Sequence, residues 1–121
     1  MIWVLRGAVA LFFFGMGGLA LVRPQRIVEI FGGRADTASS RNEVRAVYGG
    51  FGISVGGIVA SLHVWPPMYA RTAGLVLAAA VLGMAVGRVI GAIIERETRF
   101  WPTSAFVLVE LALAACLIGG A

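Results

Sequence analysis

Hydrophobic residues gather into four long runs along the chain, and polar residues fall mainly between those runs. A helix that crosses a membrane needs about 20 predominantly apolar residues, and each run approaches or exceeds that length. Because the runs contain very few formal charges, they predict membrane-spanning helices rather than the half-exposed helices of a soluble protein. The predicted spans are residues 2–22, 44–65, 69–94 and 103–120.

The connection after the first run has an amphipathic pattern of its own. Residues 24–32 predict a short helix, with Ile27 and Ile30 on one side and charged residues on the other. Such a helix favours the membrane interface, where its apolar side is buried and its charged side meets water. The sequence therefore predicts an all-α fold, an integral membrane four-helix bundle that forms a single four-span domain over residues 1–121.

Composition supports the membrane assignment. Hydrophobic residues make up 60% of the chain and charged residues only 13%, whereas about a quarter of the residues in an average soluble domain are charged. A chain of 121 residues exposes too much surface, relative to its core, for so few charges to keep it in solution. These proportions also argue against a disordered chain and a secreted disulfide scaffold.

The placement of charge limits the partners and suggests an orientation. The net charge is +4, and all ten basic residues are Arg. Most of them flank apolar runs, which is typical of anchoring at a membrane surface and not of a nucleic-acid module. The first and third connections contain more Arg than the opposite side, so the positive-inside rule predicts a cytoplasmic location for both connections and an outside location for both termini.

Metal and cofactor sites are not predicted. The chain has one cysteine, Cys116, and one histidine, His63. A single residue of each type cannot supply the ligand sets of zinc or haem, and it cannot form a redox pair.

The start of the second run contains a helix-capping signal. Ser40 and Glu43 have the S-x-x-E spacing of a capping box, in which each side chain accepts from the backbone amide of the other residue. The sequence therefore predicts that the second helix begins at Ser40.

Glycines follow in the second and third runs at spacings that suit close helix packing. Glycine lets two membrane helices approach closely, and the GxxxG spacing occurs twice in the third run. Packing inside the bundle is one interpretation, and a dimer face is the other. The residues concerned are Gly49, Gly50, Gly83, Gly87 and Gly91.

Three intramembrane charges are predicted at a common depth. A rise of 1.5 Å per residue places Arg45 about 7.5 Å from the start of its helix, and Arg88 and Glu110 about 10 Å from helix ends that meet the same membrane face. A charge near the bilayer centre costs about 2.5 to 3.5 kcal/mol on insertion scales, so intramembrane charges usually pair inside the bundle. Glu110 is expected to accept a forked pair of hydrogen bonds from one guanidinium, with Tyr48, one turn from Arg45, as a further partner.

Three interpretations of this polar network remain open. It is a structural Arg–Glu–Arg–Tyr network that joins helices, or both arginines extend to the interface. Alternatively, it forms a pocket for the polar or anionic head group of a small amphiphile. The surplus positive charge and the glycine-rich walls motivate this last interpretation.

The same residues carry a resemblance to a known family. The chain resembles small bacterial four-helix membrane proteins that are classed as a domain-of-unknown-function family. The matching motifs are Arg-Ala-x-Tyr-Gly-Gly at residues 45–50, Gly-Arg-x-x-Gly at residues 87–91, Glu110 in the fourth run and Pro24 after the first. The resemblance spans nearly the whole chain and implies a four-helix bundle in a bacterial inner membrane. It points to Arg45, Tyr48, Arg88 and Glu110 and implies no activity.

No catalytic motif accompanies these features. The chain lacks Gly-x-Ser-x-Gly, His-Glu-x-x-His and a Walker-type phosphate loop, so we expect no enzymatic activity. We expect a lipid-embedded accessory or scaffold subunit of a larger membrane complex, or a homo-oligomer. One alternative is a binder or carrier of a small amphiphile or lipid through the polar network. Another is a proton-coupled exporter of small molecules that works through Glu110.

Overall fold

The computed structural model describes residues 1–120, and all regular structure within them is helical. Four helical runs are long and apolar enough to cross a membrane, so the prediction of an all-α, multi-pass membrane protein is confirmed. Their bounds are Ile2–Val22, Ala38–Val64, Pro67–Ile94 and Phe100–Gly119.

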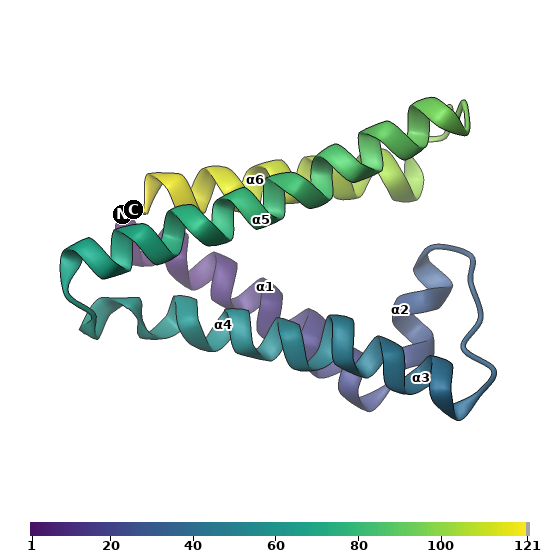
Figure 1. Cartoon of the computed structure of the whole chain (residues 1–121), viewed down its shortest axis with the longest axis horizontal. Coiled ribbons are helices and arrows are strands. Elements are labelled where there is room, and N and C mark those ends of the chain that lie inside the picture. The colour runs from purple at the N-terminus through teal and green to yellow at the C-terminus, as the bar shows by residue number, and fades with distance from the viewer. Residues whose placement is uncertain (121) are drawn as a thin grey trace. The chain divides into compact units, whose positions relative to one another are not determined.

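Two of the four runs are single α-helices and two change their helical form along their length (Figure 1). The first run is α1 (Ile2–Val22), followed by the short α2 (Pro24–Ile30). The second run consists of α3 (Ala38–Val44), the π-helix η1 (Arg45–Gly50), α4 (Phe51–Ser61) and the 3₁₀ turn η2 (Leu62–Val64). The third is α5 (Pro67–Ile94), and the fourth is the π-helix η3 (Phe100–Ser104) with α6 (Ala105–Gly119).

Internal contacts divide the chain into two compact units. One unit is Gly7–Leu62, and the other joins Met1–Arg6 to His63–Ala121. We refer to them as the α1–α4 unit and the α5–α6 unit. The single domain over residues 1–121 and the four-helix bundle that would unite all spans stay predictions.

The second helical run begins earlier than predicted, and its cap is a different pair of residues. Thr37 is the N-cap, and its hydroxyl accepts from the backbone N–H of Ser40 at 3.1 Å. The Ser40 hydroxyl in turn accepts from the backbone N–H of Thr37 at 3.2 Å. The predicted Ser40–Glu43 box is therefore wrong. Ser40 takes the third helical position because Thr37 offers an equivalent hydroxyl one turn earlier.

Glycines bring the backbones of α1 and α4 together in the α1–α4 unit. A Cβ atom built on Gly17 would lie 2.9 Å from the carbonyl oxygen of Gly49 and from the amide nitrogen of Ile53. A Cβ on Gly52 would lie 3.1 Å from the Cα of Gly17. Since neither position has room for a side chain, this backbone contact depends on glycine.

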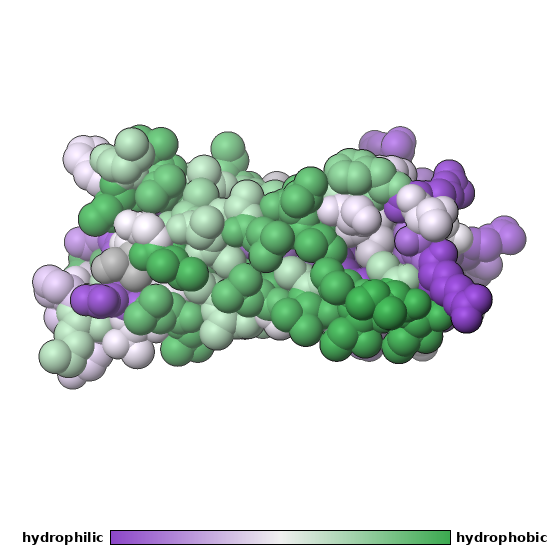
Figure 2. All heavy atoms as spheres, turned by 90° about the horizontal axis from the view of Figure 1, so that it is seen from above, coloured by the Kyte–Doolittle hydropathy of each residue, from purple (hydrophilic) through white to green (hydrophobic). Residues whose placement is uncertain are grey.

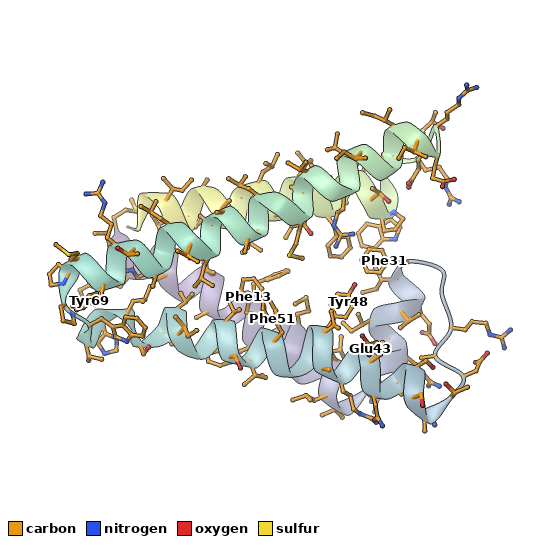
Figure 3. All side chains as sticks on the ribbon, viewed as in Figure 1. Phe13, Phe31, Glu43, Tyr48, Phe51 and Tyr69 are labelled. Carbon is orange, nitrogen blue, oxygen red and sulfur yellow. The ribbon has the colours of Figure 1, made fainter. Side chains whose placement is uncertain are left out.

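The short α2 packs its apolar side against the ends of its neighbours. Ile27 forms a buried cluster with Ala20 and Val44, and Tyr48, labelled in Figure 3, packs against it. The helix ends where Gly32 adopts a φ of 75°, a left-handed conformation that glycine takes without strain. The charged side of α2 remains exposed, as the amphipathic pattern predicts.

The α5–α6 unit is a helical hairpin with a seam of small residues. The two helices run side by side (Figure 1). The buried residues of α5 recur every three or four positions and are mostly Ala or Gly, which permits close packing of the two helices. They are Ala70, Gly74, Ala78, Val81 and Ala85. Figure 2 shows that the face seen over this hairpin is largely hydrophobic, with hydrophilic side chains gathered toward its ends.

Three predicted packing glycines lie outside this seam. A Cβ atom on Gly83, Gly87 or Gly91 would meet no atom of residues 1–120 within 4 Å. The close packing expected at these positions is therefore not found within the α5–α6 unit. The GxxxG spacing places them on one side of α5, and that side differs from the side that contacts α6.

Adjacent glycines in α1 provide a matched test of the backbone contact. We expect Gly17→Ala to lower the free energy of unfolding by about 1 to 3 kcal/mol, because the methyl group would overpack the contact with the second run. Gly18→Ala should be neutral or stabilising by up to about 1 kcal/mol, because nothing lies within 4 Å of a Cβ there. Denaturant titration in detergent micelles measures both values. Equal effects at the two positions would contradict the assigned contact.

Candidate functional site

Two charged residues interrupt the apolar seam of the α5–α6 unit at the same level. Arg88 lies three residues after the buried Ala85, so it continues the inner side of α5. Glu110 lies three residues before the buried Leu113 and occupies the inner side of α6. The helical periodicity of each sequence therefore directs both side chains into the seam.

The two side chains form a short ion pair. The Nε of Arg88 donates to Oε1 of Glu110 at 2.7 Å. The Glu110 side chain is only 5% exposed and that of Arg88 is 21% exposed. Because water is largely excluded, neither charge is screened well, and the hydrogen bond is of the strong, charge-assisted type.

An aromatic ring supports the arginine from α6. The guanidinium carbon of Arg88 lies 5.3 Å from the centroid of the Phe106 ring, within the range of a cation–π contact. Phe106 precedes Glu110 by one helical turn, so one side of α6 supplies both partners of the arginine. The Trp101 ring lies 5.7 Å from that of Phe106 and extends the aromatic surroundings toward the α5–α6 loop.

The second carboxylate oxygen of Glu110 has no partner within the α5–α6 unit. Oε2 is buried, and no hydrogen-bond donor of this unit reaches it. The forked pair of bonds that a guanidinium can make is not formed here, because Arg88 donates to Oε1 and not to Oε2. A buried acceptor left without a donor costs about 1 to 3 kcal/mol, and more when it is charged. The pair thus leaves a place where a further donor would be stabilised.

A groove lies between α5 and α6 at their loop end, and neither Arg88 nor Glu110 is among its lining residues. Its volume is about 560 Å³, within the usual range of small-molecule sites. Most of its wall is apolar, from Val89, Ala92, Ile93, Phe100, Val107 and Leu108. Its polar residues are Arg96, Glu97, Thr98, Thr103 and Ser104. The groove is therefore amphipathic, with apolar helix walls and a polar rim around the loop.

The groove and the ion pair are less than two helical turns apart along the hairpin. Val107 lies three residues before Glu110, and Ala92 lies four residues after Arg88, so each wall is one turn from its charged residue. At the rim, the Thr103 hydroxyl donates to Oε2 of Glu97 at 3.0 Å, which ties the loop to the start of the last helical run.

Arg45 and Tyr48 belong to the α1–α4 unit, where Arg45 has partners of its own. Its Nε donates to the backbone oxygen of Leu21 at 3.1 Å, and its Nη1 donates to Oδ1 of Asn42 at 3.0 Å. The Leu21 carbonyl belongs to the last turn of α1, where carbonyl groups lack intrahelical donors and a cation is favourable. The structure thus joins Arg88 to Glu110 and gives Arg45 the role of capping α1. The common layer of three charges and Tyr48 stays a prediction.

The motif that opens the second run adopts an unusual helix. Residues Arg45–Gly50, which read Arg-Ala-Val-Tyr-Gly-Gly, form the π-helix η1. Short π-helical turns often occur at functional sites because they redirect the side chains around them. Sequence reasoning missed this feature, and the paired glycines Gly49 and Gly50 are its one visible signal. Of the two, Gly49 packs closely, since a Cβ there would lie 2.8 Å from the Leu21 side chain, whereas Gly50 has a looser surrounding.

The described part of the chain offers no metal site. Residues 1–120 contain no group of three or more His, Cys, Asp or Glu side chains that could hold a metal ion. The lone Cys116 is a half-buried free thiol in α6.

The ion pair predicts a characteristic pattern of stabilities. Glu110→Ala should lower the free energy of unfolding by about 3 kcal/mol, because it leaves the charge of Arg88 without compensation in the seam. The double variant Arg88→Met with Glu110→Leu should lose less than Glu110→Ala alone, because it removes both charges and keeps the volume. Denaturant titration in micelles measures the double variant and its two single variants, Arg88→Met and Glu110→Leu, which complete the cycle. Simple additivity of the two single variants would show that the side chains do not interact.

The amino-acid sequence was compared with known families, curated proteins and solved structures. Residues 2–120 match a domain of unknown function (DUF4345). No curated protein and no solved structure matches the chain. Since the match covers nearly all of its length, the chain belongs to the DUF4345 family.

Proposed function

We propose that the protein is a non-enzymatic membrane protein that binds or carries a small amphiphile or lipid through the Arg88–Glu110 pair. The observation that carries this proposal is the buried Oε2 of Glu110, which has no donor within the α5–α6 unit. A network that served only to join helices would be favoured with both oxygens satisfied, since unmade buried hydrogen bonds destabilise a fold.

The surroundings of the pair support a ligand that comes from the lipid. The pair lies in an apolar hairpin, and the groove at the loop end of the same hairpin has apolar walls and a polar rim. Ligand sites usually combine mostly apolar walls with a few polar groups that orient the ligand. A membrane-soluble molecule reaches such a site without crossing water.

Retention of a bound molecule tests the proposal. We expect native mass spectra of the protein, released from lipid nanodiscs, to show a retained small amphiphile or lipid. Glu110→Gln should reduce this retention about tenfold, because a hydrogen bond to a charged group contributes about 1.5 to 3 kcal/mol. Glu95→Gln is the matched control, since Glu95 is exposed at the end of α5. Equal retention by both variants, or none by the wild-type protein, would reject the proposal.

The hypothesis of an accessory or scaffold subunit, or of a homo-oligomer, stays a prediction. Gly83, Gly87 and Gly91 leave open space along α5, which leaves room for the backbone of another helix. The same native spectra test it. A homo-oligomer gives multiples of the 12.7 kDa chain mass, and a subunit of a larger complex retains a different chain.

We also propose a location in a bacterial inner membrane with both termini outside. The arginines around the first and third connections support this orientation through the positive-inside bias. In a Cys116→Ala background, Thr98→Cys should react with a membrane-impermeant thiol reagent only after the cells are opened. Met68→Cys, in the opposite connection, should react in intact cells. The reverse pattern would invert the proposed orientation.

A further inference from the structure

The turn that ends α5 contains a residue in an unusual conformation. Arg96 has a φ of 52°, in the left-handed region that glycine adopts without strain. The backbone N–H of Glu97 donates to the carbonyl of Ala92 at 2.9 Å, and that of Arg96 donates to the carbonyl of Ile93 at 3.2 Å. These two bonds form a Schellman motif, in which glycine is the usual residue at the position that Arg96 occupies.

The end of α2 has the same motif, but with glycine. The backbone N–H of Gly33 donates to the carbonyl of Val28 at 3.0 Å. The N–H of Gly32, whose φ is 75°, donates to the carbonyl of Glu29 at 3.0 Å. A non-glycine residue in this conformation costs free energy, and such residues cluster at functional sites. The choice of Arg96 in the equivalent turn therefore indicates a role beyond ending the helix.

Arg96 and the residue that follows it bring opposite charges to the groove. Arg96 and Glu97 both line the groove, and both are exposed. Their Cα atoms are about 3.8 Å apart, as in any trans peptide, yet no ion pair joins the two side chains in residues 1–120. The Thr103 hydroxyl donates to Oε2 of Glu97, and a carboxylate can accept further bonds. The rim thus presents a cation and an anion side by side, with a total charge of zero.

The walls of the groove suit a hydrocarbon chain. Val89 and Ile93 on α5 and Leu108 on α6 line it, and all three are exposed apolar side chains. They belong to the spans that can cross a membrane, whereas Arg96 and Glu97 lie in the loop between those spans. The groove therefore changes from apolar to charged toward the loop, as a lipid molecule does at the membrane interface.

We propose that the α5–α6 groove binds a phospholipid whose head group carries both a phosphate and an ammonium N–H, as in phosphatidylethanolamine. The guanidinium of Arg96 donates to the phosphate, the carboxylate of Glu97 accepts from the ammonium, and an acyl chain lies against the apolar walls. Arginine suits phosphate because its planar fork can donate two parallel hydrogen bonds. Basic pockets between membrane helices are recognised sites for phosphate-bearing head groups.

Charge complementarity selects this class of lipid. A zwitterionic head group leaves the total charge of the rim at zero, whereas phosphatidylglycerol adds a negative charge beside Glu97. The ammonium of phosphatidylcholine has no N–H, so it cannot make a charge-assisted hydrogen bond to a carboxylate. The groove lining contains neither Arg88 nor Glu110, so the groove site stands independently of the function proposed above.

Competition among three lipids tests the head-group preference. The wild-type protein is placed in nanodiscs with equal amounts of phosphatidylethanolamine, phosphatidylcholine and phosphatidylglycerol that have identical acyl chains. Native mass spectra identify the lipids that stay bound. We expect phosphatidylethanolamine to be retained about tenfold more than either of the others, because it alone completes both charged contacts. Free glycerophosphoethanolamine in excess should not displace it, because that compound has no acyl chain.

Single substitutions should change the preference in different directions. Glu97→Gln gives the rim a net positive charge, so phosphatidylglycerol should become the retained lipid. Arg96→Gly should lower the retention of all three lipids about tenfold and raise the melting temperature, because glycine fits the positive φ. Glu95→Gln and Arg99→Gln are the matched controls, since they remove the same charges from exposed residues of the same loop that do not line the groove. Both controls should keep the wild-type preference.

The outcomes separate the groove from the ion pair. Equal retention of the three lipids, a wild-type preference for phosphatidylglycerol, or displacement by glycerophosphoethanolamine would overturn the groove proposal. A preference that is lost in Glu110→Gln and unchanged in Glu97→Gln would place the lipid at the ion pair, which rejects the groove and supports the proposed function. A preference that is lost in Glu97→Gln and kept in Glu110→Gln would support the groove, whatever the ion pair binds. The wild-type competition needs no variant, so it remains decisive even if a variant does not fold.

Discussion

An ion pair within an apolar hairpin is the constraint on which the α5–α6 unit depends. Glu110 is 5% exposed, and an isolated carboxylate in such surroundings would strongly destabilise the hairpin. Arg88 must therefore lie at the same level, which fixes how far α5 can slide along α6. The small residues of the seam allow close contact, but they are too alike to set this register. The pair distinguishes one alignment from its neighbours, which is the best-supported use of buried polar groups.

The α1–α4 unit reaches close helix contact by a different route. Gly17 and Gly52 bring two backbones to within van der Waals distance, and Arg45 satisfies a carbonyl at the end of α1. These contacts involve backbone groups, which are present at every residue. Specificity here comes from where glycine removes a side chain and where a long cation reaches a helix end. The arginine motif that the sequence singles out thus has a structural role inside its own unit.

The spans could be predicted from the sequence, whereas several details of their packing could not. Hydropathy locates the four runs because the requirement for apolar residues acts on each segment separately. It misplaces the start of the second helix because Ala38 to Glu43 form a polar first stretch, and both Thr37 and Ser40 can cap. Glycine spacing directed attention to Gly83, Gly87 and Gly91, yet Gly17 and Gly52 make the contact. Which glycine faces a neighbour depends on tertiary packing, and spacing within one helix does not contain that information.

For the candidate site too, the sequence predicts which residues lie at one level but does not predict their detailed contacts. Depth arithmetic places Arg88 and Glu110 together because both positions are counted from the same loop, so errors in helix ends affect them alike. The open oxygen could not be found by counting, because it depends on the direction from which the guanidinium approaches. The Nε of Arg88 donates to Oε1, and Oε2 has no donor within the α5–α6 unit. Apolar residues of similar volume would stabilise a hairpin as well as an ion pair does. A charged pair adds what apolar residues do not, because it specifies one register of α5 against α6.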